Sequence, residues 1–328
     1  MRHRVISCGR WLSAAVLVLA TGIAGAQGYP AKPIRLIVPY GPGGGTDVAA
    51  RIASHFLGER LGVQVVVENR VGGSGAVGLE AAARAVPDGY TLLFSGPDAI
   101  STLPLLRKNL PIDTLKDFVP IAQVGTADFV FAVHPKVPVH TIEELIALAK
   151  SKPGGLRYSS AGTGTTLHVM GEMLKYRTGI DLVHVPYKSG GQATIDTVAG
   201  HVEMISTAVS VIIKQIQADQ LRPLAVSSAE RSSLLPAVPT MAERGFPNFI
   251  ATSWFGVFGP KGLPEPVIKR LSDEIKAAAS SAEFRQRASA IGIGGAVLLR
   301  EDFAKYIATE LGRWREVIEV AKINVDEQ

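Results

Sequence analysis

The chain has little cysteine and no closely spaced metal ligands, and these absences exclude several classes of protein. One cysteine among 328 residues cannot form a disulfide framework or a cysteine-based structural zinc site. The seven histidines include no His-x-x-x-His or His-Glu-x-x-His pair, so no metal site is expected. We therefore predict a protein without a metal or cofactor.

Charge is also sparse and evenly mixed. The chain carries 34 Lys and Arg against 29 Asp and Glu, and its basic residues form no dense run. Hydrophobic residues make up 47% of the chain, which is ample for a buried core and excludes an intrinsically disordered protein. A formal charge of +5 alone would suit an acidic partner, so the origin of that charge matters.

The first 26 residues are typical of a secretory signal peptide. Three arginines precede an apolar run, Trp11–Ala20, and Ala24-x-Ala26 is a small-residue cleavage pattern. A retained membrane anchor is the alternative, because no charge interrupts residues 11–31. Glycines and Pro30 break the second half of that stretch, so we predict cleavage after Ala26 and export to the periplasm.

Cleavage would change the composition of the protein. Removal of residues 1–26 leaves 302 residues without cysteine, and the loss of three arginines lowers the formal charge from +5 to +2. The case for a nucleic-acid partner then loses its main support. We expect a soluble exported protein that is monomeric and binds no nucleic acid.

The rest of the chain alternates short apolar runs with helical patterns, which predicts parallel α/β sheets. The first set of strands is predicted at 34–38, 63–68 and 90–95. A second set begins afresh at 156–160 and continues at 182–185, 202–206 and 221–227. We predict a two-lobed α/β fold in which each lobe is a doubly wound, mostly parallel sheet.

The last part of the chain is predicted to be helical and to pack back on the first lobe. Helices at 265–279, 282–290 and 301–321 cannot complete a parallel sheet by themselves. The chain would then cross between the lobes twice, near 119–129 and 249–258. We predict a first lobe of residues 27–124 plus 255–328 and a second lobe of residues 125–254.

The densest motif is a glycine-rich turn between the first predicted strand and its helix, Pro39-Tyr40-Gly41-Pro42-Gly43-Gly44-Gly45-Thr46-Asp47. Such a turn exposes backbone N–H groups at the positive end of a helix and favours an anion. It is not a Rossmann fingerprint, because Thr46 stands where the third glycine is needed, and no Gly-Lys-Ser/Thr follows. A tight turn without a ligand is the alternative.

A similar turn opens a helix in the second lobe, Ser160-Ala161-Gly162-Thr163-Gly164-Thr165. Here threonine hydroxyls stand beside the backbone amides. Two such turns, one from each lobe, would hold an anion from both sides. The sequence therefore predicts an anion site between the lobes.

Other candidate residues are more ambiguous. A hydrolase turn, Gly-x-Ser-x-Gly, is nearly met around Ser74, but the last glycine is missing and Ser74 is a plausible helix N-cap. His168 is more consistent with a structural role than with a general base. Asp98 follows the third strand, where it could cap a helix or contact a ligand. Trp254 could pack at a hinge or form an aromatic wall.

Several segments together resemble a known family. The segments VPYGPGGGTD, VPDGYTLLFSG, YSSAGTGTTLH and VHVPYKSGGQA are similar to the Bug proteins, the extracytoplasmic receptors of tripartite tricarboxylate transporters. The resemblance covers nearly the whole chain after the signal peptide. It implies a periplasmic binding protein of the Venus-flytrap type that closes on a small carboxylate and delivers it to membrane permease subunits.

The resemblance also implies a set of ligand-binding residues. They fall on the two glycine turns and on positions that line the space between the lobes. They are Tyr40, Gly43, Gly44, Thr46, Asp47, Ser95, Gly96, Asp98, Ser160, Gly162, Thr163, Gly164, Thr165, His168, Pro186, Tyr187 and Thr207.

One position departs from the family pattern. Many relatives have an Asp-Asn-like pair after the strand at 202–205, where this chain has Thr207-Ala208. An amino-acid ligand needs a carboxylate in the protein to bind its ammonium group, so the missing acidic residue weakens the case for such a ligand. An unaminated or aromatic carboxylate is favoured instead. Two alternatives stay open: an exported serine hydrolase using Ser74 or Ser160, and a ligand-sensing partner of a signalling receptor.

Overall fold

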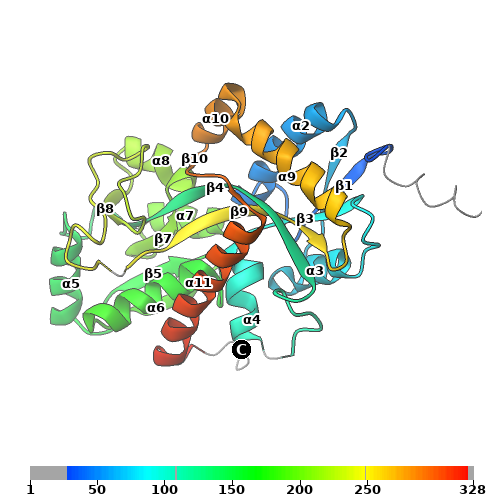
Figure 1. Cartoon of the computed structure of the whole chain (residues 1–328). Coiled ribbons are helices and arrows are strands. Elements are labelled where there is room, and N and C mark those ends of the chain that lie inside the picture. Colours follow the sequence, from blue (N-terminus) through cyan, green and yellow to red (C-terminus); the bar gives the residue numbers. More distant parts are fainter. Residues whose placement is uncertain (1–27, 108, 248, 324–328) are drawn as a thin grey trace, which may run out of the picture.

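The computed structural model describes residues 28–323 except 108 and 248, and the predicted signal peptide lies outside this range. The described chain has two halves, and strands β4 (Phe118–Val133) and β9 (Thr252–Pro260) run between them (Figure 1). The strand order is β2-β1-β3-β9-β4-β7-β5-β6. The strands of the two halves therefore follow one another in a single order of paired strands, with those of each half at opposite ends.

The first half is built on three parallel strands. β1 (Ile34–Val38) lies between β2 (Val65–Asn69) and β3 (Thr91–Ser95). The connecting helices lie on both faces of the sheet, as expected for right-handed parallel crossovers. They are α2 (Gly45–Leu61), η2 (Gly73–Gly75), α3 (Ala76–Ala83), η3 (Asp98–Thr102) and α4 (Leu103–Leu106).

The second half repeats this plan. β5 (Arg157–Ser160) pairs in parallel with β6 (Val183–Pro186) and with β7 (Met204–Ala208), while β8 (Arg222–Val226) pairs with β4. Its helices again cover both faces of the sheet, which buries two separate apolar clusters. These helices are α5 (Ile142–Ser151), α6 (Thr166–Thr178), α7 (Gly190–Val198) and α8 (Val209–Gln217).

A single strand links the two sheets. β4 pairs with β9 as far as Asp128 and with β7 from Phe129 onward, all antiparallel. The sequence predicts two separate apolar runs here, at 119–124 and 129–133, whereas the structure has one strand of 16 residues. Both ends of the strand are buried, because each end lies in the middle of a different sheet.

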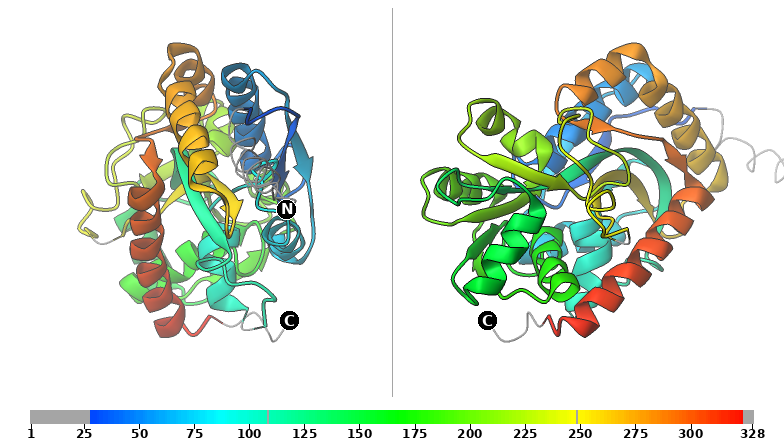
Figure 2. Two further views of the ribbon diagram at one scale, coloured as in Figure 1. Left: turned by 45° about the vertical axis from the view of Figure 1, so that its right-hand side comes forward. Right: turned by 90° about the vertical axis from the view of Figure 1, so that its left-hand side faces the viewer.

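The C-terminal helices only partly follow the prediction. α9 (Glu265–Ser280) and α10 (Ala282–Ser289) pack on α2 in the first half, as expected. α11 (Arg300–Val320) instead contacts both halves. Its first part, including Phe303, packs in the first half, and its last part, including Trp314, packs in the second half. α11 therefore joins the two cores, beside the crossing strands (Figure 2).

The capping box that the sequence predicts at residues 141–144 is confirmed, whereas the N-cap predicted at Ser74 is wrong. Thr141 caps α5, accepting from Glu144 N at 3.2 Å, while the Glu144 carboxylate accepts from His140 N at 2.6 Å. Ser74 does not cap α3. It lies in the left-handed region at φ 58° within a short turn, and Gly75 holds the N-cap position. The glycines around Ser74 move the start of the helix beyond it.

Candidate functional site

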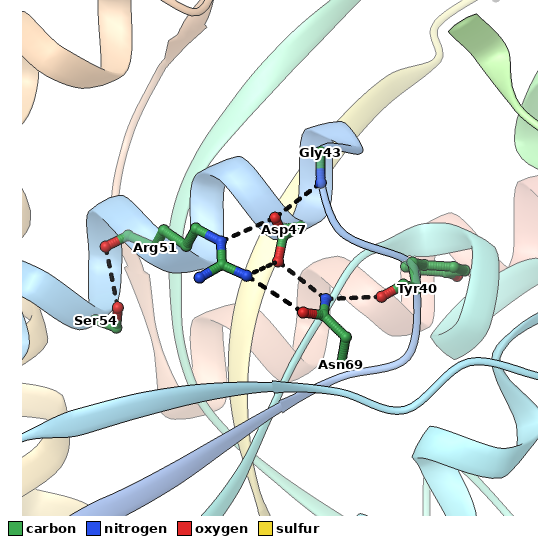
Figure 3. A network of polar contacts seen from close by, with 6 residues as sticks. All are labelled: Tyr40, Gly43, Asp47, Arg51, Ser54 and Asn69. Atoms are coloured by element: carbon green, nitrogen blue, oxygen red, sulfur yellow. Dashed lines mark hydrogen bonds and ion pairs between the residues drawn. The ribbon is translucent and has the colours of Figure 1, made fainter. Parts of the chain in front are cut away.

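The first glycine turn is shaped by Asp47, which is buried at the start of α2. Its carboxylate accepts hydrogen bonds from Gly43 N at 2.9 Å, from Asn69 Nδ2 at 2.9 Å and from Arg51 Nε and Nη2 at 3.0 Å each (Figure 3). Asn69 Nδ2 also donates to the carbonyl of Tyr40 at 2.8 Å. The turn is thus tied to β2 and to the next turn of its own helix.

This network fixes the charge of Asp47 and leaves the helix end uncapped. Burial raises the pKa of Asp47, but the hydrogen bonds from Arg51, Gly43 and Asn69 outweigh it and lower that pKa overall. Gly44 is the N-cap of α2 and provides no side-chain cap. The first amides of a helix have no intrahelical acceptor, so this end of α2 presents donors that a bound anion could use.

The second glycine turn is held by bonds within itself. Thr165 Oγ1 donates to the carbonyl of Gly162 at 2.8 Å, and Gly164 N donates to His168 Nδ1 at 3.2 Å. Ser160 Oγ is hydrogen-bonded to His184 Nε2 at 2.7 Å. Several predicted ligand-binding groups therefore already have partners in the protein, which keeps the turn rigid.

Two stacked histidines lie behind this turn. The rings of His168 and His184 are 4.1 Å apart and nearly parallel, and His184 also stacks on Tyr158. Burial lowers the pKa of His168, and burial followed by the charge of His168 lowers the pKa of His184 to about 3. Both rings are therefore neutral at ordinary pH, in keeping with the structural role predicted for His168.

The two halves meet at Asp98. Thr166 N, at the start of α6 in the second half, donates to Asp98 Oδ1 of the first half at 2.7 Å. The sequence offered two roles for Asp98, a helix cap or a ligand contact, and the structure shows a cap on a helix of the other half. Burial raises the pKa of Asp98, although the bond from Thr166 N opposes this shift.

Unpaired hydroxyl groups surround this meeting point. Tyr40 Oη, Ser95 Oγ and Thr166 Oγ1 are buried and have no hydrogen-bond partner. Burial and then the Asp98 carboxylate raise the pKa of Tyr40 well above its ordinary value. Buried polar atoms without partners are uncommon, so these three groups mark a place where a polar ligand or water would be held.

Comparison with known proteins identifies the family. Residues 49–323 match the family described as "Tripartite tricarboxylate transporter family receptor". The chain belongs to this family. Protein BugT of Bordetella pertussis is 36% identical over 307 residues, which cover 92% of this chain and 94% of BugT. The resemblance of the sequence to Bug receptors is therefore confirmed.

Two solved structures confirm the two-lobed periplasmic binding protein fold. An R. palustris protein with adipate is 30% identical, with a TM-score of 0.84, and the match covers 90% of this chain and 99% of that one. MatC from Rhodopseudomonas palustris with bound malate is 25% identical, with a TM-score of 0.78, covering 88% and 100%. Both relatives hold small dicarboxylates.

The remaining predicted residues of this receptor lie around the same region, in different surroundings. Ser95 and Thr207 are buried, whereas Pro186 is exposed and Tyr187 is half-buried. Tyr187 donates its hydroxyl to Asp196 Oδ2 at 2.8 Å. A side chain at Gly96 would come within 2.8 Å of the carbonyl of Trp254, so backbone packing requires glycine there.

A serine hydrolase needs a histidine bonded to its serine and an acid bonded to that histidine, and only the first contact is present at Ser160 in the described residues. Ser160 and His184 are paired, but within the described residues no Asp or Glu is hydrogen-bonded or ion-paired to His184. A histidine with a pKa of about 3 is also a weak base at neutral pH. Ser74 is exposed, and no described histidine is bonded to it.

Sequence reasoning missed three residues that organise this receptor. Arg51 and Asn69 hold the first turn, and the Asp47-x-x-x-Arg51 spacing on one helix face could have indicated the first of them. Glu310 is buried on α11 and accepts from Trp254 Nε1 at 2.7 Å and from Ser101 Oγ at 2.8 Å. No local pattern marks Glu310, because its partners lie more than 50 residues away.

The described residues contain neither a metal-binding cluster nor a membrane-spanning helix. No group of three or more His, Cys, Asp or Glu among them could hold a metal ion. Across residues 28–323, leaving out 108 and 248, every helix is too short or too polar to cross a membrane.

Proposed function

We propose that this chain is a periplasmic receptor that binds a small carboxylate between its two halves and delivers it to the permease subunits of a tripartite tricarboxylate transporter. Family membership and the adipate and malate bound by relatives support a carboxylate ligand. In this proposal the protein is exported by a cleavable signal peptide, acts as a monomer and is not an enzyme.

One observation carries the proposal. The uncapped start of α2 belongs to the first half and the start of α6 to the second half, and the carboxyl group of Asp98 in the first half is hydrogen-bonded to the start of α6. Asp98 accepts from Thr166 N at 2.7 Å. The α6 end therefore binds a carboxylate group, and the unpaired hydroxyls of Tyr40 and Ser95 lie on the side of the first half.

The predicted ligand-binding residues then take two roles. Tyr40, Gly44, Thr46 and Ser95 would contact the ligand through amides and hydroxyls. Thr166, which was not among the predicted residues, would join them through its hydroxyl. Asp47 already accepts four hydrogen bonds, so we assign it to positioning the first turn, together with Arg51 and Asn69. Ser160, Gly162, Gly164, Thr165 and His168 would likewise shape the second turn through their mutual bonds.

Thermal unfolding against a panel of carboxylates tests the proposal. Aliphatic and aromatic mono- and dicarboxylates, with aspartate and glutamate as aminated counterparts, should raise the melting temperature selectively. At a ligand concentration of 100 times Kd the stabilisation is about 2.7 kcal/mol. An unchanged melting temperature with every member of the panel would contradict a carboxylate receptor.

A further inference from the structure

A cavity lies away from the two glycine turns, on the second half of α11. Its volume is about 310 Å³. Its walls come from α6, from the segment that leads into β9, and from the second half of α11. α11 lies against α6 on one side and α4 on the other (Figure 1). A molecule in this cavity would therefore touch elements that join the two halves.

The cavity wall carries buried donors that have no acceptor. Arg313 Nε and Trp314 Nε1 are both buried without a hydrogen-bond partner, and the Trp314 side chain is 3% exposed. Arg177 at the rim is 3.8 Å from Glu316, whereas no described carboxylate forms an ion pair with Arg313. Glu310 in the same wall interacts with the charge of Arg313, yet neither buried N–H has an acceptor within hydrogen-bond distance, so both can donate to an anionic ligand.

The rest of the wall is apolar. Met173, Ile250, Ala251 and Val317 face the same space. Glu310 lies at the wall as well, but its Oε2 atom already accepts from Trp254 and Ser101. The cavity thus combines one pair of free donors with an apolar surface, the pattern of a site for a small amphipathic acid.

We propose that this cavity is a second binding site, for a monocarboxylate with a short apolar body. The carboxylate would accept from Arg313 Nε and Trp314 Nε1, and the apolar body would pack on Met173 and Val317. This site is independent of the ligand held by the glycine turns.

The neighbouring Glu310 makes binding depend on pH. Burial raises the pKa of Glu310 to about 7, against the opposing bonds from Trp254 and Ser101 and the opposing charge of Arg313. A neutral Glu310 does not repel a bound carboxylate, whereas an ionised one does. Binding should therefore be tighter at pH 6 than at pH 8.

Nitrogen-15 labelling of tryptophan in the full chain tests the proposal, with benzoate and hexanoate as probes. The indole N–H signal of Trp314, assigned with Trp314→Phe, should shift saturably, and less strongly at pH 8 than at pH 6. Arg313→Leu should weaken the response at least about tenfold, and Arg313→Lys, which keeps the charge without the Nε donor, should weaken it partially. Circular dichroism checks that both variants are folded.

Gly44→Val separates this site from the glycine turns. It should leave the response of Trp314 to benzoate intact, even where it abolishes binding between the halves. A Trp314 signal that does not move at probe concentrations up to about 10 mM overturns the proposal. So does a shift that survives Arg313→Leu, or one that disappears in Gly44→Val, because the signal would then originate at the other site.

Discussion

At the scale of single residues, Asp98 accepts a hydrogen bond from Thr166 N, a donor that a ligand carboxylate could otherwise use. Its 2.7 Å bond to Thr166 N joins the two halves and places a carboxyl group at the start of α6. A ligand carboxylate that uses the same amide must displace Asp98, and one bound nearby is repelled by it. Asp98 should therefore disfavour ligands whose second carboxylate points toward it.

Replacement of Asp98 tests this competition. Asp98→Asn removes the charge while keeping an oxygen that can accept from Thr166 N. We expect affinity for dicarboxylates to rise about tenfold, which corresponds to about 1.4 kcal/mol, with a smaller change for monocarboxylates. Calorimetric titration of both classes measures the difference. Equal or weaker binding of dicarboxylates by Asp98→Asn would show that Asp98 does not oppose them.

Glu310 gives a pH-dependent contribution to stability. Its pKa is raised to about 7 by burial, while the unfolded chain has an ordinary value near 4.5. Between these values the folded protein keeps a proton that the unfolded chain loses, so the free energy of unfolding falls as pH rises through this window. The difference in pKa corresponds to about 3 kcal/mol at most.

Glu310→Gln isolates this contribution. The glutamine oxygen can still accept from Trp254 and Ser101, but the group no longer titrates. Urea unfolding at pH 5 and pH 8 should show wild type losing more stability than Glu310→Gln over this interval. The comparison between the two proteins cancels other titrating groups, including His184. Parallel pH profiles would mean that Glu310 keeps an ordinary pKa in the folded protein.

At the scale of elements, the first turn depends on one side-chain network. Arg51 and Asn69 hold Asp47, and Asp47 in turn accepts from Gly43 N. Arg51→Leu should lower ligand affinity about tenfold by loosening the turn. Arg60→Leu is the matched control, because it removes an exposed ion pair with Glu274 at the other end of the same helix. Equal affinities of the two variants would remove Arg51 from the site.

Periodicity and turn residues predicted most elements of this chain. The strands β1, β3, β5 and β8 and the helix α9 lie within a few residues of their predicted ranges. The same holds for α2, α5 and α6, whose patterns predict helices at 46–61, 141–150 and 165–177, because each has a local signal such as the capping box at Thr141. The continuity of β4 across Gly125–Asp128 was missed. Its pairing with β9 there overrides a locally polar stretch.

At the scale of the whole molecule, the two-lobed plan could be predicted because the strand-and-helix pattern starts twice. The placement of α11 could not, since an amphipathic helix shows which face is apolar but not which core covers it. Phe303 and Trp314 lie on one helix and pack in different cores. The exact division into lobes, at residues 124/125 and 254/255, stays a prediction.

The same limit applies to the site. The glycine turns were predicted from local composition, whereas the bond between Asp98 and Thr166 joins residues 68 positions apart. Cross-molecule contacts of this kind depend on how the halves close. Ligand binding should favour the closed arrangement, since only there do both turns contact the ligand. Small-angle X-ray scattering should show a smaller radius of gyration with ligand than without, and no change would contradict closure.

Calorimetric titration of a stabilising carboxylate into wild type and Gly44→Val tests the central claim most directly. Gly44 has φ −74° and room for a side chain, so valine should block the end of α2 without straining the backbone, unlike Gly43 at φ 81°. Gly294→Val is the matched control, since Gly294 also has free space. We predict binding by wild type and Gly294→Val, and a loss of at least about tenfold in Gly44→Val. Undiminished binding by Gly44→Val would contradict the claim that the glycine turn of α2 holds the ligand.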